Sequence, residues 1–213
     1  SFYYLSGMVE SNATLVLVNG VNGPSSTIFC ASKNKLQEIW HGRRIGVDAA
    51  PDVLMIDQAY SNESLADKLI DLLDDASQVV YSFSRAGTGE LVQQSLSMLR
   101  RLARQGKICP TQLADLDPLV NAMRLLKSEA EVAQMAAACA ISVTAHKRAM
   151  NVCKVGMHEY QMAAELHHQF TTQGSQRLAY GSIVAGGENA CILHYTNNDQ
   201  VLQDGDLVLI DAG

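Results

Sequence analysis

The sequence predicts an α/β fold in its first half and an α+β arrangement in its second half. In the first half, short apolar runs typical of strands alternate with helical patterns. In the second half, two long helical patterns come first and strand-like runs follow them. The chain has 213 residues, enough for one large domain or two small ones with a substantial hydrophobic core.

The elements of the first half can be assigned in order. The runs ATLVLVNG and STIFCAS have strand length and are separated by the turn-rich GVNGPS, which predicts a β-hairpin. The segment SNESLADKLIDLLDDA places its leucines at helical spacing behind polar residues that can cap a helix, and QVVYSF then resumes as a strand. A further helix, TGELVQQSLSMLRRLARQG, is expected to end at Gly106.

A connector is predicted where the pattern changes. Pro110 and Pro118 bracket the segment ICPTQLADLDPLV. Proline interrupts both helices and central strands, so we place a domain boundary here. The predicted domains are 1–112, an N-terminal α/β domain, and 113–213, a second domain.

The second domain begins with helices and ends with strands. Ser128 and Glu131 form a capping-box pattern at the start of a long Ala-rich helix, which we expect Gly156 to break. The segment MHEYQMAAELHHQFTTQG predicts another helix, and GSIVAGG, CILHYT and DLVLIDAG read as strands. Asp204-Gly205 is a strong hairpin signal between the last two of these runs.

Composition excludes several classes of protein. The formal net charge is −6 and no Lys/Arg-rich patch stands out, which argues against a nucleic-acid partner. No apolar run has the length of a membrane span. The five cysteines are scattered without CxxC spacing, so they are interpreted as reduced thiols of a cytoplasmic protein. The opening SFYYLSG lacks Met and starts in apolar, aromatic chain, so we do not expect a natural start here.

The final run, DGDLVLIDAG, carries an acid in an unusual position. With alternating side chains, Leu207, Leu209 and Asp211 share one strand face, while Val208 and Ile210 share the other. A carboxylate placed among buried neighbours is costly unless it meets a metal, a cation or hydrogen-bond donors. Taken alone, the pattern favours the simpler interpretation that Asp211 begins a turn.

Histidines offer further candidates. His194 lies in the apolar run CILHY, and on its own this position favours a core histidine with satisfied hydrogen bonds over a catalytic one. If CILHYT and the last strand form the predicted hairpin, His194 and Asp211 should point into one concavity. His167 and His168 are helix neighbours that point in different directions and make a poor chelate.

One aromatic residue has two interpretations. In NKLQEIWHGRR, the residues Leu36, Ile39 and Trp40 form a helical apolar stripe. The pattern by itself favours packing of Trp40 into its own domain.

Several motifs together resemble a known family. MRLLKSEAEVAQM, GGENACILHY and DGDLVLIDAG, in this order and spacing, resemble the metallopeptidases of the pita-bread fold, and within them the aminopeptidase P family of Xaa-Pro aminopeptidases. YLSGMVESNATLVL and EIWHGRRIGVDAAP are similar to the amino-terminal domain of those enzymes. The resemblance implies an α/β N-terminal domain of the creatinase/prolidase type, followed by the first half of a pita-bread catalytic domain.

The resemblance also implies roles for individual residues. Asp211 corresponds to the first of a set of metal ligands that holds two divalent ions, usually Mn²⁺, which generate a hydroxide and polarise the scissile carbonyl. His194 corresponds to a catalytic histidine that hydrogen-bonds substrate near the scissile bond. Trp40 corresponds to an aromatic wall of the substrate site, contributed by a neighbouring subunit, and Arg104 to a substrate-binding arginine.

The implied function is metal-dependent release of the N-terminal residue from peptides with proline in the second position. The implied assembly is a homo-oligomer, a dimer or a tetramer. The alternatives are a non-catalytic pita-bread module that binds peptides or proteins, and a hydrolase of the prolidase or creatinase kind. Retention of Asp211 and His194 favours catalysis, and the Trp40 motif favours an Xaa-Pro aminopeptidase. The remaining ligands of the family follow Asp211, so we expect this chain to be an inactive internal piece of a longer enzyme.

Overall fold

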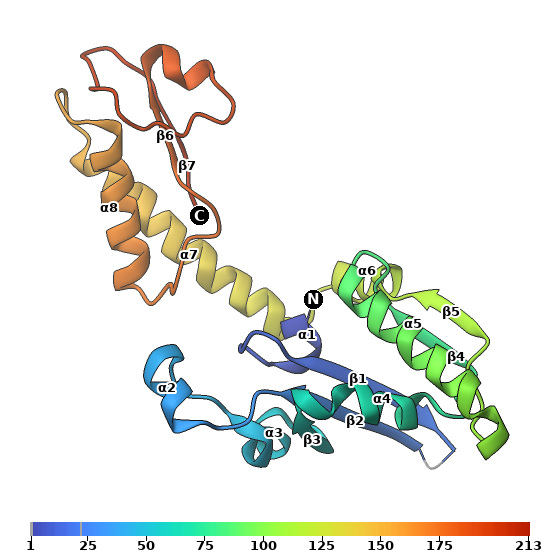
Figure 1. Cartoon of the computed structure of the whole chain (residues 1–213). Helices are drawn as coiled ribbons and strands as arrows, with labels where there is room; N and C mark the ends of the chain where they lie inside the picture. Colours follow the sequence, from blue (N-terminus) through green and yellow to red (C-terminus); the bar gives the residue numbers. More distant parts are fainter. Residues whose placement is uncertain (1, 22) are drawn as a thin grey trace. The chain divides into compact units, whose positions relative to one another are not determined.

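A computed structural model describes residues 2–21 and 23–213 and divides the chain into two compact units (Figure 1). Unit 1 is Ser1–Leu126 and unit 2 is Lys127–Gly213. The division lies later than the boundary predicted after residue 112. The reason is that the expected connector is structured and belongs to unit 1: it forms strand β5 (Gln112–Asp115) and then helix α6 (Asp117–Leu125).

Unit 1 begins with a short helix, α1 (Phe2–Ser6), and a three-stranded sheet. Strands β1 (Thr14–Gly20) and β2 (Gly23–Cys30) pair antiparallel, which confirms the predicted hairpin. Strand β3 (Gln58–Ser61) joins β2 in parallel after helices α2 (Lys35–His41) and α3 (Gly46–Leu54). The core of this part consists of small and medium apolar side chains: Met8, Ile28, Cys30, Ala50 and Ile56.

The rest of unit 1 contains the predicted helices and strand. After the short η1 (Asn62–Ser64) come α4 (Leu65–Leu73), β4 (Gln78–Tyr81), α5 (Ala86–Arg101) and η2 (Leu102–Gln105). Strand β4 pairs in parallel with β5, so α5 and η2 form the crossover between them. The buried faces of α4 and α5 pack on β4. The buried residues of this core are Leu69, Leu73, Val79, Val92, Leu96 and Leu99.

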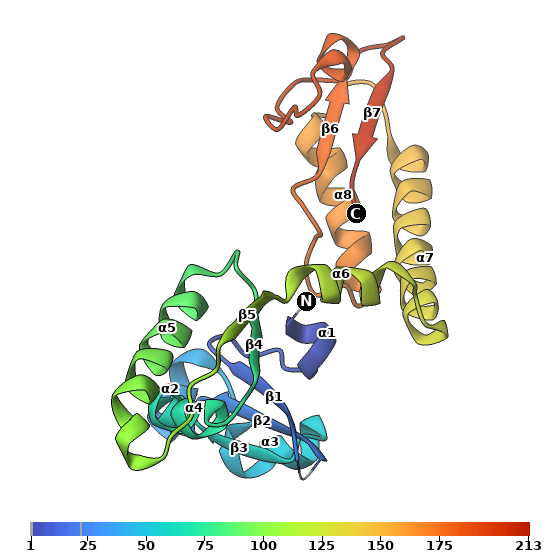
Figure 2. The ribbon, with the colours of Figure 1, turned by 90° about the vertical axis from the view of Figure 1, so that its right-hand side faces the viewer.

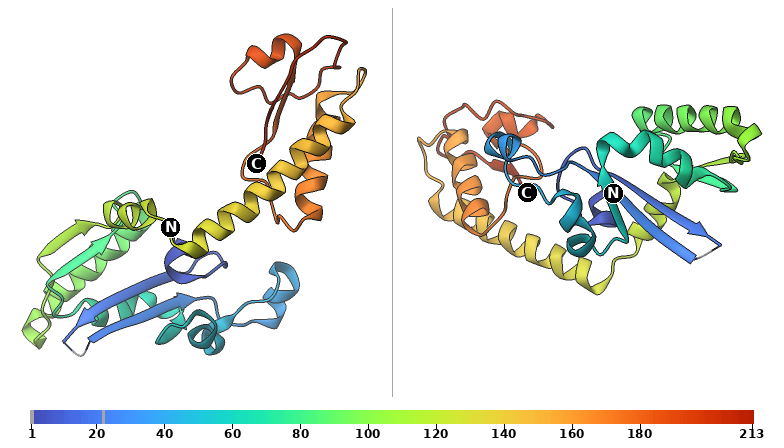
Figure 3. Two further views of the ribbon diagram at one scale, coloured as in Figure 1. Left: turned by 180° about the vertical axis from the view of Figure 1, so that it is seen from behind. Right: turned by 60° about the horizontal axis from the view of Figure 1, so that its bottom comes forward.

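Unit 2 is built on two helices, α7 (Glu129–Val152) and α8 (Glu159–Thr172), which lie side by side (Figures 2 and 3). The predicted capping box at the start of α7 is confirmed. Ser128 Oγ accepts from the Glu131 amide at 3.3 Å, and Glu131 Oε2 accepts from the Ser128 amide at 2.8 Å. Fully buried Ala145 and Ala149 let α8 approach closely.

A two-stranded antiparallel sheet covers these helices. Its strands are β6 (Ile183–Gly186) and β7 (Val208–Asp211), joined by η3 (Gly187–Cys191) and a long loop (Figure 2). The predicted strands GSIVAGG and DLVLIDAG are confirmed. The prediction of a strand at CILHYT and of its hairpin with the last strand is wrong.

The reason for this error lies in burial. Strand β6 buries Ile183, Val184 and Ala185 and therefore takes the place beside β7. In CILHYT, by contrast, Ile192 and Leu193 stay exposed and only a later tyrosine is buried. The Asp204-Gly205 pair does form a turn, but inside the loop.

Within residues 2–21 and 23–213, no helix combines the length and apolar character that a membrane crossing requires.

Candidate functional site

Asp211 is the last residue of β7, and the predicted alternation of this strand is confirmed. Val208 and Ile210 pack against the core formed with α7 and α8, whereas Leu209 and Asp211 are exposed on the other face. The expectation that Asp211 enters a buried interior is therefore wrong. The helices cover only one face of this short sheet, so the carboxylate stands on the open one.

Tyr180 holds the Asp211 carboxylate in place. Its hydroxyl donates to Asp211 Oδ1 at 2.5 Å. This hydrogen bond is the main reason that the pKa of Tyr180 lies above its ordinary value, and partial desolvation adds to the effect. Nearby, the Ala179 amide donates to the Gly213 carbonyl at 2.8 Å, which ties the segment before β6 to the residues after β7.

His194 lies in a turn after η3 and is exposed. The residue after it, Tyr195, is buried against Ile183 and Ala185 of β6. Ile183 is directly opposite Asp211 in the antiparallel register, so these two side chains lie on the same face of the sheet. The loop that carries His194 thus packs on the β6 side of the face that bears Asp211, and leaves Leu209 and Asp211 of β7 exposed. That the two side chains themselves meet at one substrate stays a prediction.

A buried carboxylate organises this loop. Glu159, at the start of α8, has no exposed surface. Its Oε1 accepts from the Gly186 amide at 2.7 Å and from Asn189 Nδ2 at 3.1 Å. Its Oε2 accepts from the Tyr195 hydroxyl at 2.7 Å and from the Gln200 amide at 3.0 Å. One side chain therefore contacts the end of β6, η3 and both halves of the following loop.

The hydrogen bonds decide the charge of this network. Burial by itself raises the pKa of Glu159, but donation from Gly186, Tyr195, Asn189 and Gln200 outweighs burial, so its pKa lies below the ordinary value. Burial, followed by the hydrogen bond to Glu159, raises the pKa of Tyr195 to about 12. At neutral pH an ionised carboxylate accordingly meets neutral donors, which makes charge-assisted hydrogen bonds.

Side chains also hydrogen-bond backbone groups on the edge of β6 that faces away from β7. Asn198, whose φ is 50°, accepts from the Val184 amide through Oδ1 at 3.0 Å and donates to the Ser182 carbonyl through Nδ2 at 2.8 Å. Asparagine tolerates this left-handed backbone better than most residues. Neither Asn198 nor Glu159 could be identified from the sequence, because both look like ordinary polar residues of a loop and a first helical turn.

Trp40 and Arg104 both lie in unit 1, and the structure does not bring them together. Helix α2 and the end of α5, where η2 follows, lie at opposite ends of the unit (Figures 1 and 3). The side chain of Trp40 is 81% exposed, and Leu36 and Ile39 beside it are also exposed. Packing of Trp40 into its own domain, which the pattern alone favoured, is therefore wrong. Arg104 is exposed on η2.

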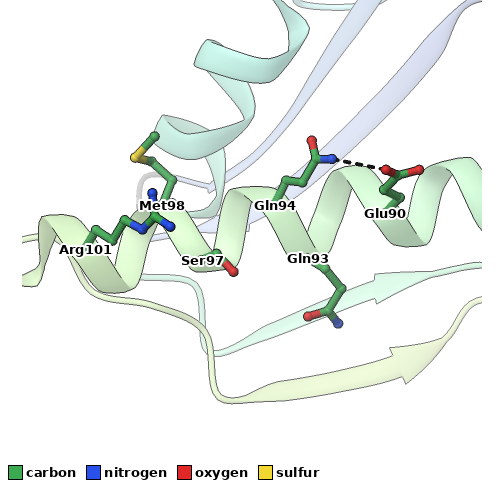
Figure 4. A pocket seen from close by; sticks show the side chains of 6 residues that line it. All are labelled: Glu90, Gln93, Gln94, Ser97, Met98 and Arg101. Atoms are coloured by element: carbon green, nitrogen blue, oxygen red, sulfur yellow. Dashed lines mark hydrogen bonds between the residues drawn. The ribbon is translucent and has the colours of Figure 1, made fainter.

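A surface hollow lies elsewhere in unit 1. Figure 4 shows that its lining residues all come from α5, with Gln94 donating to Glu90 at 3.3 Å; the lining is Glu90, Gln93, Gln94, Ser97, Met98 and Arg101. None of the predicted site residues is among them. Walls from a single helix do not enclose a ligand, so this hollow is not a candidate active site.

The metal-binding potential rests on Asp211. An exposed carboxylate supplies the hard oxygen donors that divalent ions such as Mn²⁺ prefer. Across residues 2–21 and 23–213, no group of three or more His, Cys, Asp or Glu side chains is arranged to hold an ion. His167 and His168 are exposed on α8 and form no such group. The described residues fit a single ligand of a site rather than a complete one.

Two family models match the two units. Residues 133–213, which include Asp211 and His194, match metallopeptidase family M24, and residues 1–81, which include Trp40, match the aminopeptidase P N-terminal domain. Unit 2 is thus assigned to the M24 metallopeptidases over nearly its whole length, and the first part of unit 1 matches the aminopeptidase P N-terminal domain. The fold of the chain is accordingly that N-terminal domain followed by the beginning of the pita-bread domain.

Individual relatives are consistent with this assignment. The chain is 40% identical over its whole length to an Xaa-Pro aminopeptidase of Escherichia coli K12, of which it covers 48%. It superimposes on a solved structure of E. coli aminopeptidase P with a TM-score of 0.96, covering 49% of that chain. For proline aminopeptidase P II from Yersinia pestis, the identity is 42% and the TM-score 0.95. The chain thus spans about half the length of the relatives it matches.

Proposed function

We propose that the whole enzyme containing this chain is a metal-dependent aminopeptidase that releases the N-terminal residue from peptides with proline in the second position. The observation that carries this proposal is the M24 match over residues 133–213, in which Asp211 and the loop bearing His194 lie on one face of the β6–β7 sheet. Relatives at 40% and 36% identity, from E. coli and Haemophilus influenzae, are named Xaa-Pro aminopeptidases.

Proline explains why a dedicated site is needed. It has no amide hydrogen, and its ring restricts the residue before it, so the bond differs in shape and hydrogen bonding from other peptide bonds. In this proposal Asp211 supplies one carboxylate ligand, and Tyr180 orients it through the hydrogen bond to Oδ1. When bound, the divalent ions, which we propose to be a pair of Mn²⁺, would supply Lewis-acid chemistry, namely activation of water and polarisation of the scissile carbonyl. The further ligands belong to the half of the enzyme's length that this chain does not span.

The other site residues act on the substrate. His194 stands exposed on a firmly held loop, where its imidazole can hydrogen-bond the substrate beside the scissile bond. Trp40 offers a large exposed ring as a wall for the substrate of a neighbouring subunit. Arg104 is a weaker candidate for binding peptide, because it lies at the other end of unit 1. The exposed stripe of Leu36, Ile39 and Trp40 supports a dimer or tetramer.

This function is tested with two pairs: a proline peptide against the matching alanine peptide, and the wild type against Asp211→Ala. The whole enzyme should cleave a tripeptide with proline in the second position and leave the matching alanine peptide nearly intact. Cleavage of Xaa-Pro dipeptides alone would instead favour a prolidase, and binding without turnover at any divalent metal would favour a non-catalytic module. Asp211→Ala should abolish turnover, and metal analysis of the purified variant should find less bound metal than in the wild type.

We also propose that the whole enzyme is cytoplasmic. All five thiols are free, as expected for a cytoplasmic protein. One relative from Arabidopsis thaliana, 30% identical, is named as mitochondrial. Fractionation of the source cells would distinguish the two.

A further inference from the structure

We propose that Glu159 is a positioning residue for the reaction: it fixes the loop of residues 187–200 and, through Tyr195, sets the place of the His194 imidazole above the Asp211 face of the sheet. The inference rests on the proposed function, since the position of His194 matters only if this side chain meets the substrate.

The first step is the geometry of the loop. Between η3 and β7 the chain has almost no regular secondary structure, so no strand or helix ladder holds it in place. Glu159 provides partners at the start, middle and end of the loop, through Asn189, Tyr195 and Gln200. A side chain with no exposed surface cannot exchange these partners for water. Each of these three hydrogen bonds therefore restrains the loop, and the fourth, from the Gly186 amide, ties the same carboxylate to β6.

The second step connects this anchor to His194. The ring of Tyr195 packs against Ile183 and Ala185, and its hydroxyl is held 2.7 Å from Glu159 Oε2. Both ends of the Tyr195 side chain are thus fixed. Its backbone is the direct neighbour of His194, whose own side chain is exposed. The result is an exposed imidazole whose backbone is held in place, as positioning a group against a bound substrate requires.

The network requires a carboxylate rather than an amide at position 159. Oε1 and Oε2 each face two donors, one of which is a backbone amide, Gly186 on one side and Gln200 on the other. A glutamine at this position must turn its NH₂ group toward one of the two sides. The Tyr195 hydroxyl can rotate to accept from that NH₂, but the Gln200 amide cannot. Glu159→Gln must therefore take the carboxylate acceptor away from at least one partly buried donor while barely changing the volume of the side chain.

The experiment compares two variants of the whole enzyme, Glu159→Gln and Glu165→Gln. Glu165 lies on the same helix, but it pairs with Arg148 at 2.7 Å on a partly exposed surface, so it receives the same chemical change outside the network. The measurements are kcat and KM on a tripeptide with proline in the second position, and hydrogen exchange followed by mass spectrometry.

For Glu159→Gln we expect kcat to fall about tenfold or more, because small displacements of a catalytic group are costly, while KM changes less than about twofold. Peptides covering residues 187–200 should exchange faster, and those covering α7 should not change. Tyr195→Phe, which keeps the ring and removes only the hydroxyl, should change both measurements in the same direction. Glu165→Gln should match the wild type in both.

Several outcomes would overturn the positioning role. One is faster hydrogen exchange of the loop in Glu159→Gln with unchanged kcat, which would mean that Glu159 only stabilises the loop and does not position His194. Another is a lower kcat with unchanged loop exchange. A third is an equal loss of kcat per folded molecule in Leu166→Ala, a buried core variant of α8 that weakens unit 2 without touching the network. An inactive wild type would overturn the proposed function itself, whereas each of these three outcomes is observed in an active enzyme.

Discussion

At neutral pH the buried side chain of Glu159 is negatively charged, because its hydrogen bonds outweigh the cost of burial. A carboxylate whose pKa is lower in the folded state than in the unfolded state stabilises the fold above its unfolded pKa. That contribution is lost as the pH falls through the folded pKa. Acid should therefore release the loop of unit 2 that this carboxylate holds.

This gives a prediction for the pH dependence of stability. The free energy of unfolding of the wild type should fall as the pH drops below the usual carboxyl range, and Glu159→Gln should remove part of that dependence. At neutral pH the variant should lose about 2 kcal/mol, since a partly buried donor loses its charged acceptor. Urea unfolding followed by circular dichroism at several pH values measures both. Asp57 and Asp74 also have lowered pKa values, so the difference between wild type and variant is the relevant quantity. Parallel curves would contradict the prediction.

Tyr180 provides an independent probe of Asp211. Because the hydrogen bond to Asp211 is the main cause that raises the pKa of Tyr180, Asp211→Ala should bring that pKa back toward the ordinary tyrosine value. Ultraviolet titration of the tyrosinates measures the change, and Tyr180→Phe identifies which part of the signal belongs to this residue. An unaltered titration in Asp211→Ala would show that the two side chains do not pair in solution.

Residues of the site differ in how far sequence could predict them. Asp211 and His194 stand in short motifs that resemble a family, so they could be proposed without coordinates. Glu159 could not, because its partners reach as far as Gln200, 41 positions away, and no local pattern records them. The supposed burial of Asp211 failed for a related reason: an alternating strand does not say which of its faces is covered.

Among the elements, α7 depends on a well-formed N-terminal cap. The Ser128 hydroxyl accepts from the Glu131 amide, and Ser128→Ala removes that acceptor. We expect a loss of about 1 kcal/mol in the free energy of unfolding of unit 2. The matched control is Ser142→Ala, the same change inside the helix, where alanine is the better helix former and the stability should not fall. Equal losses in both variants would contradict the role of the cap.

Helix α2 is the opposite case, an element with no buried residue. Trp40 is 81% exposed, so Trp40→Ala should change the free energy of unfolding by less than about 0.5 kcal/mol. The specificity constant of the whole enzyme should nevertheless fall, because the proposed wall of the substrate site is lost. Leu96→Ala, which truncates a buried side chain of the same unit, should instead cost about 3 kcal/mol. A large drop in melting temperature for Trp40→Ala, with kinetics per folded molecule unchanged, would contradict this role.

Elements with local signals could be predicted well. The β1–β2 hairpin, α4, α5, α7 and α8 follow from turn residues, caps and apolar spacing that lie within each segment. CILHYT could not be assigned correctly, because an apolar run of strand length becomes a strand only if a neighbour pairs with it. Strand β7 pairs with β6 instead of CILHYT. The reason is that β6 buries Val184 and its neighbours, whereas the apolar residues at the start of CILHYT stay exposed.

At the scale of the whole molecule, the position of the division between the units can be tested. Strand β5 pairs with β4, so residues 112–115 complete a sheet of unit 1. A polypeptide of residues 1–126 should unfold cooperatively, whereas residues 1–112 lack nearly all of β5 and all of α6 and should be markedly less stable. Thermal unfolding by circular dichroism compares them. Equal melting temperatures would restore the earlier boundary.

The side-chain amide of Asn198 imitates the backbone of a missing strand, offering one acceptor and one donor to the outward edge of β6. Glu159 occupies the next outward amide, that of Gly186. Unpaired strand edges are templates for uncontrolled β-sheet association, and here one edge is blocked without the use of a single strand residue. Growth of this sheet is therefore directional: another strand can join along β7, next to Asp211, but not along β6. An Asn198→Ala variant would reopen the blocked side and make the sheet vulnerable to aggregation.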